Sequence, residues 1–211
     1  MMKRTLFKIH HSLTMLTLKR LLLAISMGCL IATANAAPLD DAVTAYERGD
    51  YAEALKILRP LAIQGGASAQ LNLGAMYDNG EGVTQDYKEA GRWYRLAAAQ
   101  GDASAQYNLG VMYHNGEGVT QDYKEAVKWY RLAAAQGDAE AQYSLGVMYE
   151  KGQGVTQDYI RAHMWWNLAS SAGDAGGDKN RDIVAKKMTP QQIEKAQDMA
   201  RECQAKDFKE C

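Results

Sequence analysis

The sequence is poor in the residues that most catalytic and metal sites require. Its 211 residues include three cysteines and four histidines. Beyond residue 36 the histidines are His114 and His163, and neither stands at metal-ligand spacing from another histidine or a cysteine. Neither has a neighbouring serine or cysteine in a recognised nucleophile motif. We therefore expect a non-catalytic protein with no cofactor, no cofactor-binding residue and no metal site.

Dense positive charge and long apolar runs are also scarce. Without residues 1–36, 19 Lys and Arg stand against 25 Asp and Glu, which gives a net charge near −6. There is no basic stripe for phosphate contacts, so nucleic acid is not an expected partner. No stretch beyond the first 36 residues is apolar enough to span a bilayer. The remaining 175 residues suffice for one domain.

The first 36 residues are typical of a secretory signal peptide. Five Lys and Arg precede the apolar run 21–32, and small residues precede a cleavage site after Ala36. We expect an exported protein, most simply a periplasmic one. Secretion and lipidation at Cys29 are the alternatives, and translation from Met15 would leave a more compact leader. In an oxidising compartment, Cys203 and Cys211 can form a disulfide across the seven residues between them.

The rest of the chain is organised around a 36-residue unit that occurs three times, at residues 67–102, 103–138 and 139–174. The first two copies differ at only five positions. A fixed period of this length predicts stacked supersecondary units that cover each other's apolar faces. In the second copy, Asp102 caps a first helix (helix A) that ends at Gly116. A second helix (helix B) opens at Asp122, with Glu125 completing a capping box.

The segments that flank the repeats predict terminal caps. Residues 37–66 read as an N-terminal capping helix pair, with Asp40 or Asp41 capping its first helix. Residues 175–211 read as C-terminal capping helices, one from about Asp178 and a second from Thr189. We therefore predict an all-α protein with three full repeats between two caps.

The repeated phrase resembles the Sel-one-like repeat (SLR), a relative of the tetratricopeptide repeat. The second copy reads A-Q-Y-N-L-G-V-M-Y, then G-E-G-V-T-Q-D, then A-V-K-W-Y-R-L-A-A. The resemblance covers residues 67–174 almost completely and implies a right-handed α/α solenoid that binds proteins or peptides. Some exported relatives are cysteine-rich, but this chain has no cysteine within its repeats. We expect a monomeric scaffold or adaptor of the cell envelope.

A candidate binding face follows from the differences between the first two copies. Three of the five fall at i, i+4 and i+7 of helix A, which is one helical face. By resemblance to tetratricopeptide proteins, this face would line a peptide-binding groove, whose asparagines can clamp a peptide backbone. We call the following twelve residues the helix-A groove: Leu71, Asn72, Ala75, Asp78, Tyr107, Asn108, Val111, His114, Tyr143, Ser144, Val147 and Glu150. The differences could equally be drift between near-duplicates.

The recurring aromatic residues favour packing over ligand binding. Trp93, Trp129 and Trp165 recur at a helical face that must pack, although a tryptophan row could bind a glycan. Three other functions stay open: a cell-wall or β-lactam hydrolase of the cysteine-rich SLR type, a secreted effector that acts on a host cell, and a glycan-binding module.

Overall fold

A computed structural model describes residues 38–209 and 211, and it shows helices and no strand within these ranges. The predicted signal peptide, the alternative translation start at Met15 and the alternative lipidation of Cys29 lie outside the described residues. The chain divides into two units, one ending at Ile57 and the other spanning Leu58–Cys211. None of the described helices is both long and apolar enough to cross a membrane.

A helix over residues 38–47 is followed, after a turn at Gly49, by α2 (Tyr51–Ile63), and the boundary between the two units falls within α2. The prediction that Asp40 or Asp41 caps this helix is wrong, because both residues already lie inside it. Tyr46 and Tyr51 pack edge to face across the turn, with ring centroids 5.3 Å apart.

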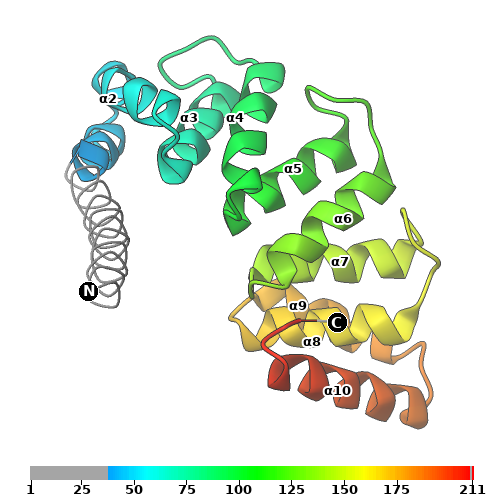
Figure 1. The fold of residues 1–211 in the computed structure, drawn as a ribbon. Helices are drawn as coiled ribbons and strands as arrows, with labels where there is room; N and C mark the ends of the chain where they lie inside the picture. The colour runs from blue at the N-terminus through cyan, green and yellow to red at the C-terminus, as the bar shows by residue number, and fades with distance from the viewer. Residues whose placement is uncertain (1–37, 210) are drawn as a thin grey trace, which may run out of the picture. The chain divides into compact units, whose positions relative to one another are not determined.

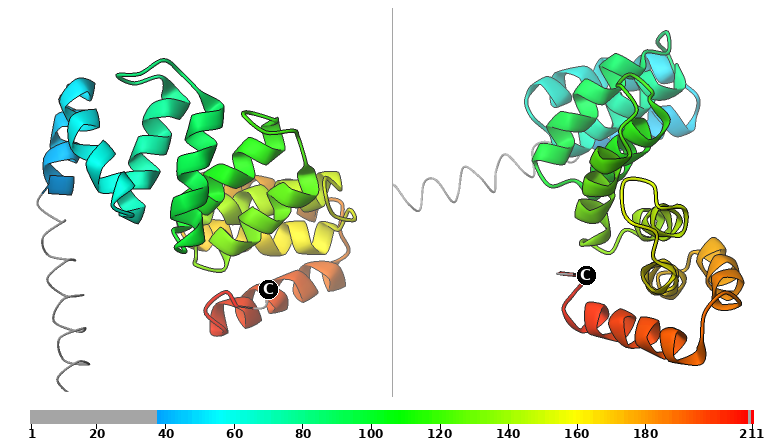
Figure 2. Two further views of the ribbon diagram at one scale, coloured as in Figure 1. Left: turned by 45° about the horizontal axis from the view of Figure 1, so that its top comes forward. Right: turned by 90° about the vertical axis from the view of Figure 1, so that its right-hand side faces the viewer.

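The second unit consists of antiparallel helix pairs in register with the 36-residue period. The A helices are α3 (Ala67–Asn79), α5 (Ala103–Asn115) and α7 (Ala139–Lys151). The B helices are α4 (Tyr87–Ala99), α6 (Tyr123–Ala134) and α8 (Tyr159–Ser171). Each helix packs on the next one in the chain, from α3 to α9, as Figures 1 and 2 show. The prediction of an all-α solenoid is confirmed.

Caps define the ends of the repeated helices. The Asp102 carboxylate accepts from the Ala105 amide, and Gly116 ends α5 in the left-handed conformation at φ +80°. At α6, the Asp122 carboxylate accepts from the amides of Lys124 and Glu125. The predicted capping box is only half formed there. The Asp122 amide donates to Tyr113 O, while the Glu125 side chain pairs with Lys128.

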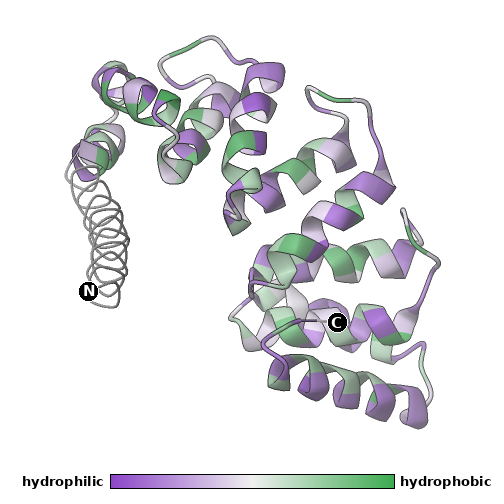
Figure 3. Ribbon diagram, in the orientation of Figure 1, coloured by the Kyte–Doolittle hydropathy of each residue, from purple (hydrophilic) through white to green (hydrophobic). Residues whose placement is uncertain are grey.

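The core is formed by the apolar faces of amphipathic helices, and the same packing recurs in each helix pair. Figure 3 shows polar and apolar residues alternating along the helices. Ala105, Leu109 and Met112 form a buried stripe on α5. The ring of Tyr130 on α6 lies so close to Gly110 that a Cβ there would be 2.5 Å from the ring. The same contact recurs in the flanking repeats, where Tyr94 meets Gly74 and Trp166 meets Gly146.

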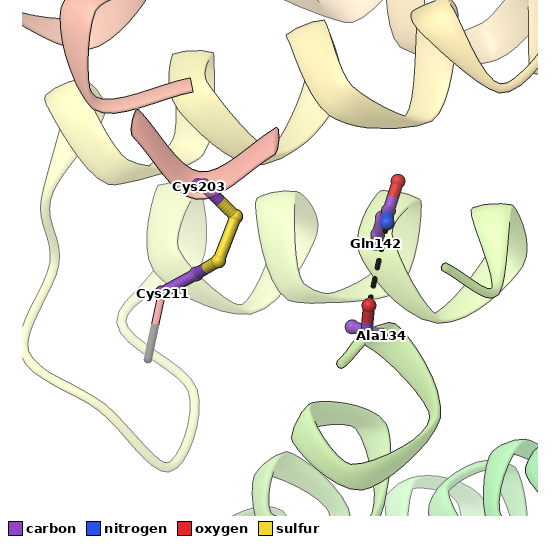
Figure 4. The surroundings of a disulfide bond; sticks show 4 residues. All are labelled: Ala134, Gln142, Cys203 and Cys211. Atoms are coloured by element: carbon purple, nitrogen blue, oxygen red, sulfur yellow. Dashed lines mark hydrogen bonds between the residues drawn. A yellow bond between two sulfur atoms is a disulfide. The ribbon is translucent and has the colours of Figure 1, made fainter. Parts of the chain in front are cut away.

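Neighbouring repeats are also joined by buried glutamines. Gln106 Nε2 donates to Ala98 O of the preceding repeat at 3.3 Å, and Gln136 Nε2 of the same repeat as Gln106 donates to Gln106 Oε1 at 2.8 Å. Gln142 likewise donates to Ala134 O at 3.4 Å, as Figure 4 shows. Its Oε1 is buried, however, and finds no donor within the described residues, because the residue one repeat after Gln136 is Ala172.

The C-terminal cap consists of α9 (Ala175–Ala185) and α10 (Pro190–Ala205). The expected start of α9 at Asp178 is wrong by three residues, because Asp174 caps the helix by accepting from the Gly177 amide. Gly177 has no side chain to keep α9 away from α8, since a Cβ there would be 2.8 Å from Trp166 O. Helix α10 begins after Thr189, as predicted, with a capping box between Thr189 and Gln192, and it packs along α8.

Candidate protein-binding groove

The structure places the twelve residues of the helix-A groove at equivalent positions on α3, α5 and α7. All twelve side chains are half-buried, between the buried stripe of each A helix and solvent. Helices α3 and α5 contain no lysine or arginine, so this face carries little positive charge. A surface of apolar and polar residues with little positive charge suits a neutral or cationic polypeptide.

The second and third repeats bring part of this face together into a pocket of about 220 Å³. Val111 and His114 of α5 line one side, while Tyr143, Ser144 and Val147 of α7 line the other. Five of the twelve candidates therefore surround one hollow. Tyr130 and Met148 complete its wall.

Sequence reasoning missed Tyr130 and Met148 because both lie on faces that the repeat predicts to be core. Both side chains are almost fully buried, so only a small part of each reaches the pocket. Gly110 is the sequence signal that could have located Tyr130. A glycine in a helix, one position before the groove residue Val111, admits the Tyr130 ring between the A helices.

Hydroxyl groups converge beside this pocket. The Tyr107 and Tyr130 rings lie 5.9 Å apart, and the hydroxyls of both interact with the Ser144 side chain. Burial raises the pKa of Tyr107 and, more strongly, that of Tyr130, so both phenols stay protonated at neutral pH. They offer neutral hydrogen-bonding groups to a ligand.

Polar side chains also line the groove in the first and second repeats. Tyr94 donates to the Asp78 carboxylate at 3.2 Å, and burial raises the pKa of Asp78 despite this hydrogen bond. Asn72 and Asn108 make no side-chain hydrogen bond to another described residue, and both are half-exposed. Their amides are therefore positioned to bind a peptide backbone with donor and acceptor together.

Helix α9 limits the groove at the third repeat. Asn180 Nδ2 donates to the Tyr143 hydroxyl at 2.9 Å, and Lys187 pairs with Glu150 at 3.1 Å. Tyr143 and Glu150 thus contact the C-terminal cap. Among the described residues, the groove residues on α3 and α5 have no such contact with the cap and are more accessible.

The two described histidines and the repeated tryptophans lie mainly in packing contacts. His163 is only 3% exposed on α8, where burial, and then the positive charge of Arg181, lower its pKa. His114 contacts Asn115 and the Tyr123 ring. Among the described residues, no three His, Cys, Asp or Glu side chains gather as metal ligands. The three repeated tryptophans bury their indole nitrogens, although Trp93 and Trp129 are half-buried as whole residues.

The C-terminal tail is held by the disulfide between Cys203 and Cys211, whose Cα atoms lie 5.4 Å apart (Figure 4). The disulfide turns the tail back towards α6, where the Phe208 ring lies beside Gly137. The tail therefore borders a second hollow, on the B helices and separate from the helix-A groove.

Tandem helix pairs that repeat with one sequence period define an α/α solenoid of the helical repeat class. The profile of the Sel1 repeat matches residues 67–102, 103–138 and 139–174, the same ranges as the three copies. The chain belongs to the Sel1 repeat family. Proteins of this family are generally non-enzymatic scaffolds for protein interaction.

Solved structures agree with this assignment. The chain is 36% identical to a Sel1 repeat protein from Oxalobacter formigenes, over 69% of this chain and 59% of that one, with a TM-score of 0.66. It is 29% identical to a protective antigen with an SLR fold from uropathogenic Escherichia coli, over 82% of this chain and 47% of that one, with a TM-score of 0.58. It thus spans about three fifths and about half of their lengths. No protein with a curated description matches significantly.

Proposed function

We propose that this protein is a non-catalytic, monomeric adaptor of the cell envelope that binds a protein or peptide through the helix-A groove. The observation that carries this proposal is the pocket between α5 and α7, because it gathers five groove residues from two repeats around one hollow. A partner side chain of moderate size fits such a hollow, while the neighbouring amides and hydroxyls hold the partner's backbone.

The groove favours a partner that is apolar and not acidic. Val111 and Val147 supply apolar contact, and the only carboxylates among the twelve residues are Asp78 and Glu150. Glu150 is already paired with Lys187. A neutral or cationic segment would therefore meet no unfavourable charge along α3 and α5.

The envelope location rests on the leader-like first 36 residues. The disulfide agrees with an oxidising compartment. A fractionation experiment with the full chain tests the location: the processed protein should be released with the periplasm. Recovery from the culture medium would favour the secreted-effector alternative, and recovery from the cytoplasm would contradict export.

Site-specific photo-crosslinking in the producing cell tests the groove. A photoreactive residue replaces Tyr107 in one strain and Glu194, an exposed residue of α10, in the control strain. We expect one envelope protein to be captured from position 107 and not from position 194, and the additional substitution Val111→Ser should reduce its capture. Equal capture from both positions, or capture that Val111→Ser leaves unchanged, would contradict the proposal.

A further inference from the structure

The B helices carry a second face, and the chain itself covers that face in only one repeat. Residues four apart on each B helix form a stripe that we call the helix-B stripe. It consists of Lys88, Arg92 and Leu96 on α4, of Lys124, Lys128 and Leu132 on α6, and of Ile160, Met164 and Leu168 on α8. In the first two repeats the stripe is two cations and a leucine, whereas in the third it is wholly apolar.

The leucine of the stripe is exposed in the two repeats whose stripes carry cations and buried in the repeat whose stripe is apolar. Leu96 and Leu132 are 49% and 50% exposed, while the equivalent Leu168 is 1% exposed. An A-type helix follows each of the three B helices, so the additional element at α8 is α10, which packs along it (Figure 1). Helix α10 therefore accounts for the burial of the third stripe and shows that an amphipathic helix fits against this side of a B helix.

A hollow of about 450 Å³ lies at Leu132, beside the seat of α10. Trp165 of α8 and Phe208 of the tail border it, and Lys128 and Arg131 stand at its rim. Its volume lies within the range of small-molecule and side-chain pockets. The unoccupied stripe on α6 is thus continuous with the surface that α10 already covers.

The charge of the stripes on α4 and α6 indicates that a helix bound there would differ from α10. The third stripe, which α10 covers, has no charged residue, whereas the first two have two cations each. Arg92 and Lys128 pair within their own helices with Glu89 and Glu125, yet both remain mostly exposed. Lys88 and Lys124 add further positive charge beside them. We propose that the helix-B stripes of α4 and α6 bind an acidic amphipathic helix of a partner protein, with an apolar side chain seated at Leu132.

The probe for this proposal is a dye-labelled, 16-residue peptide designed as an amphipathic helix, as long as α10, with glutamates beside its apolar stripe. Its counterpart has lysine at every glutamate. Fluorescence anisotropy with the full, oxidised chain measures the binding of both. We expect saturable binding of the acidic peptide, at least about tenfold weaker binding of the basic one, and weakening as salt is raised.

Two substitutions in the protein locate the site. Leu132→Ser should weaken the acidic peptide by about tenfold or more, because it removes the central apolar anchor. The pair Lys124→Glu and Lys128→Glu should also weaken it and remove the salt dependence. One matched control is Ile183→Ser, at a similarly exposed apolar residue of α9. The other is the pair Lys179→Glu, exposed on α9, and Lys186→Glu, exposed at its C-cap.

Several results would overturn the proposal. They are equal binding of both peptides, equal losses in the control variants, and loss of binding only when the groove residue Val111 is changed. Self-association in analytical ultracentrifugation that Leu132→Ser abolishes would identify a second copy as the occupant instead. None of these results depends on whether the helix-A groove binds its own partner.

Discussion

The unpaired oxygen of Gln142 provides a direct test of how the two helices of one repeat are joined. In the first two repeats, Gln100 and Gln136 donate to the buried Gln70 and Gln106 of the preceding A helices, both at 2.8 Å. Gln142 is fully buried, and the corresponding donor is missing because residue 172 is alanine. An unpaired buried acceptor costs about 1–3 kcal/mol. Substituting Ala172→Gln should therefore stabilise the protein.

The backbone already suits this change. Ala172 has φ −88° and ψ 2°, almost identical to φ −87° and ψ 0° at Gln100, and both are C-caps of a B helix. Ordering a glutamine side chain costs up to about 1.5–2 kcal/mol, which offsets part of the gain. We expect the free energy of unfolding to rise by about 1 kcal/mol and the melting temperature by about 2–4 °C.

Urea denaturation followed by circular dichroism measures the effect. Ala99→Gln is the matched control, because it makes the same substitution at an exposed helix end. The gain must disappear when Gln142 is replaced by leucine, since the acceptor is then gone. If Ala172→Gln leaves stability unchanged, or stabilises the Gln142→Leu variant equally, the reasoning from the repeated glutamine pair is refuted.

Three further predictions address packing, pH and redox state. Gly110→Ala should lower the free energy of unfolding by about 1–3 kcal/mol in urea denaturation, because its Cβ would meet the Tyr130 ring at 2.5 Å. Burial lowers the pKa of His163 below the 6.5 of the unfolded chain, so the unfolded state binds more protons in acid. Stability should therefore fall as pH drops through about 6.5, and this fall should be smaller in His163→Phe when melting temperatures are compared across pH. Replacing both Cys203 and Cys211 with serine should lower stability by about 2 kcal/mol and make it insensitive to thiol reductants.

The repeat period made most of the fold predictable from the sequence. Because the same caps and glycines recur every 36 residues, each copy supports the reading of the others, and the predicted ends of helix A at Asp102 and Gly116 match the structure. The capping box at Asp122 was predicted from local pattern alone. It failed because the Asp122 amide has a better-placed acceptor in Tyr113 O, across the turn.

The candidate site was less predictable than the fold. Helical spacing placed the groove residues on one face, but it could not show which of them surround a pocket, because that depends on how α5 and α7 pack across Tyr130. The early start of α9 was missed for a similar reason. Gly176 and Gly177 lower helix propensity locally, yet the Asp174 cap and close packing against α8 outweigh that cost.

Differences between the repeats therefore carry information that the shared pattern does not. Where α10 covers the third repeat, Lys128 is replaced by Met164 and Lys124 by Ile160, because a covered position disfavours an unpaired charge. The leucine of the stripe is kept in all three repeats, although only Leu168 is buried by the chain itself. In the first two repeats this leucine is about half exposed, and its position is the one in the stripe that is apolar in all three repeats. This pattern is expected if another molecule covers the surface. The lysine and arginine side chains around this leucine favour a molecule with negative charge.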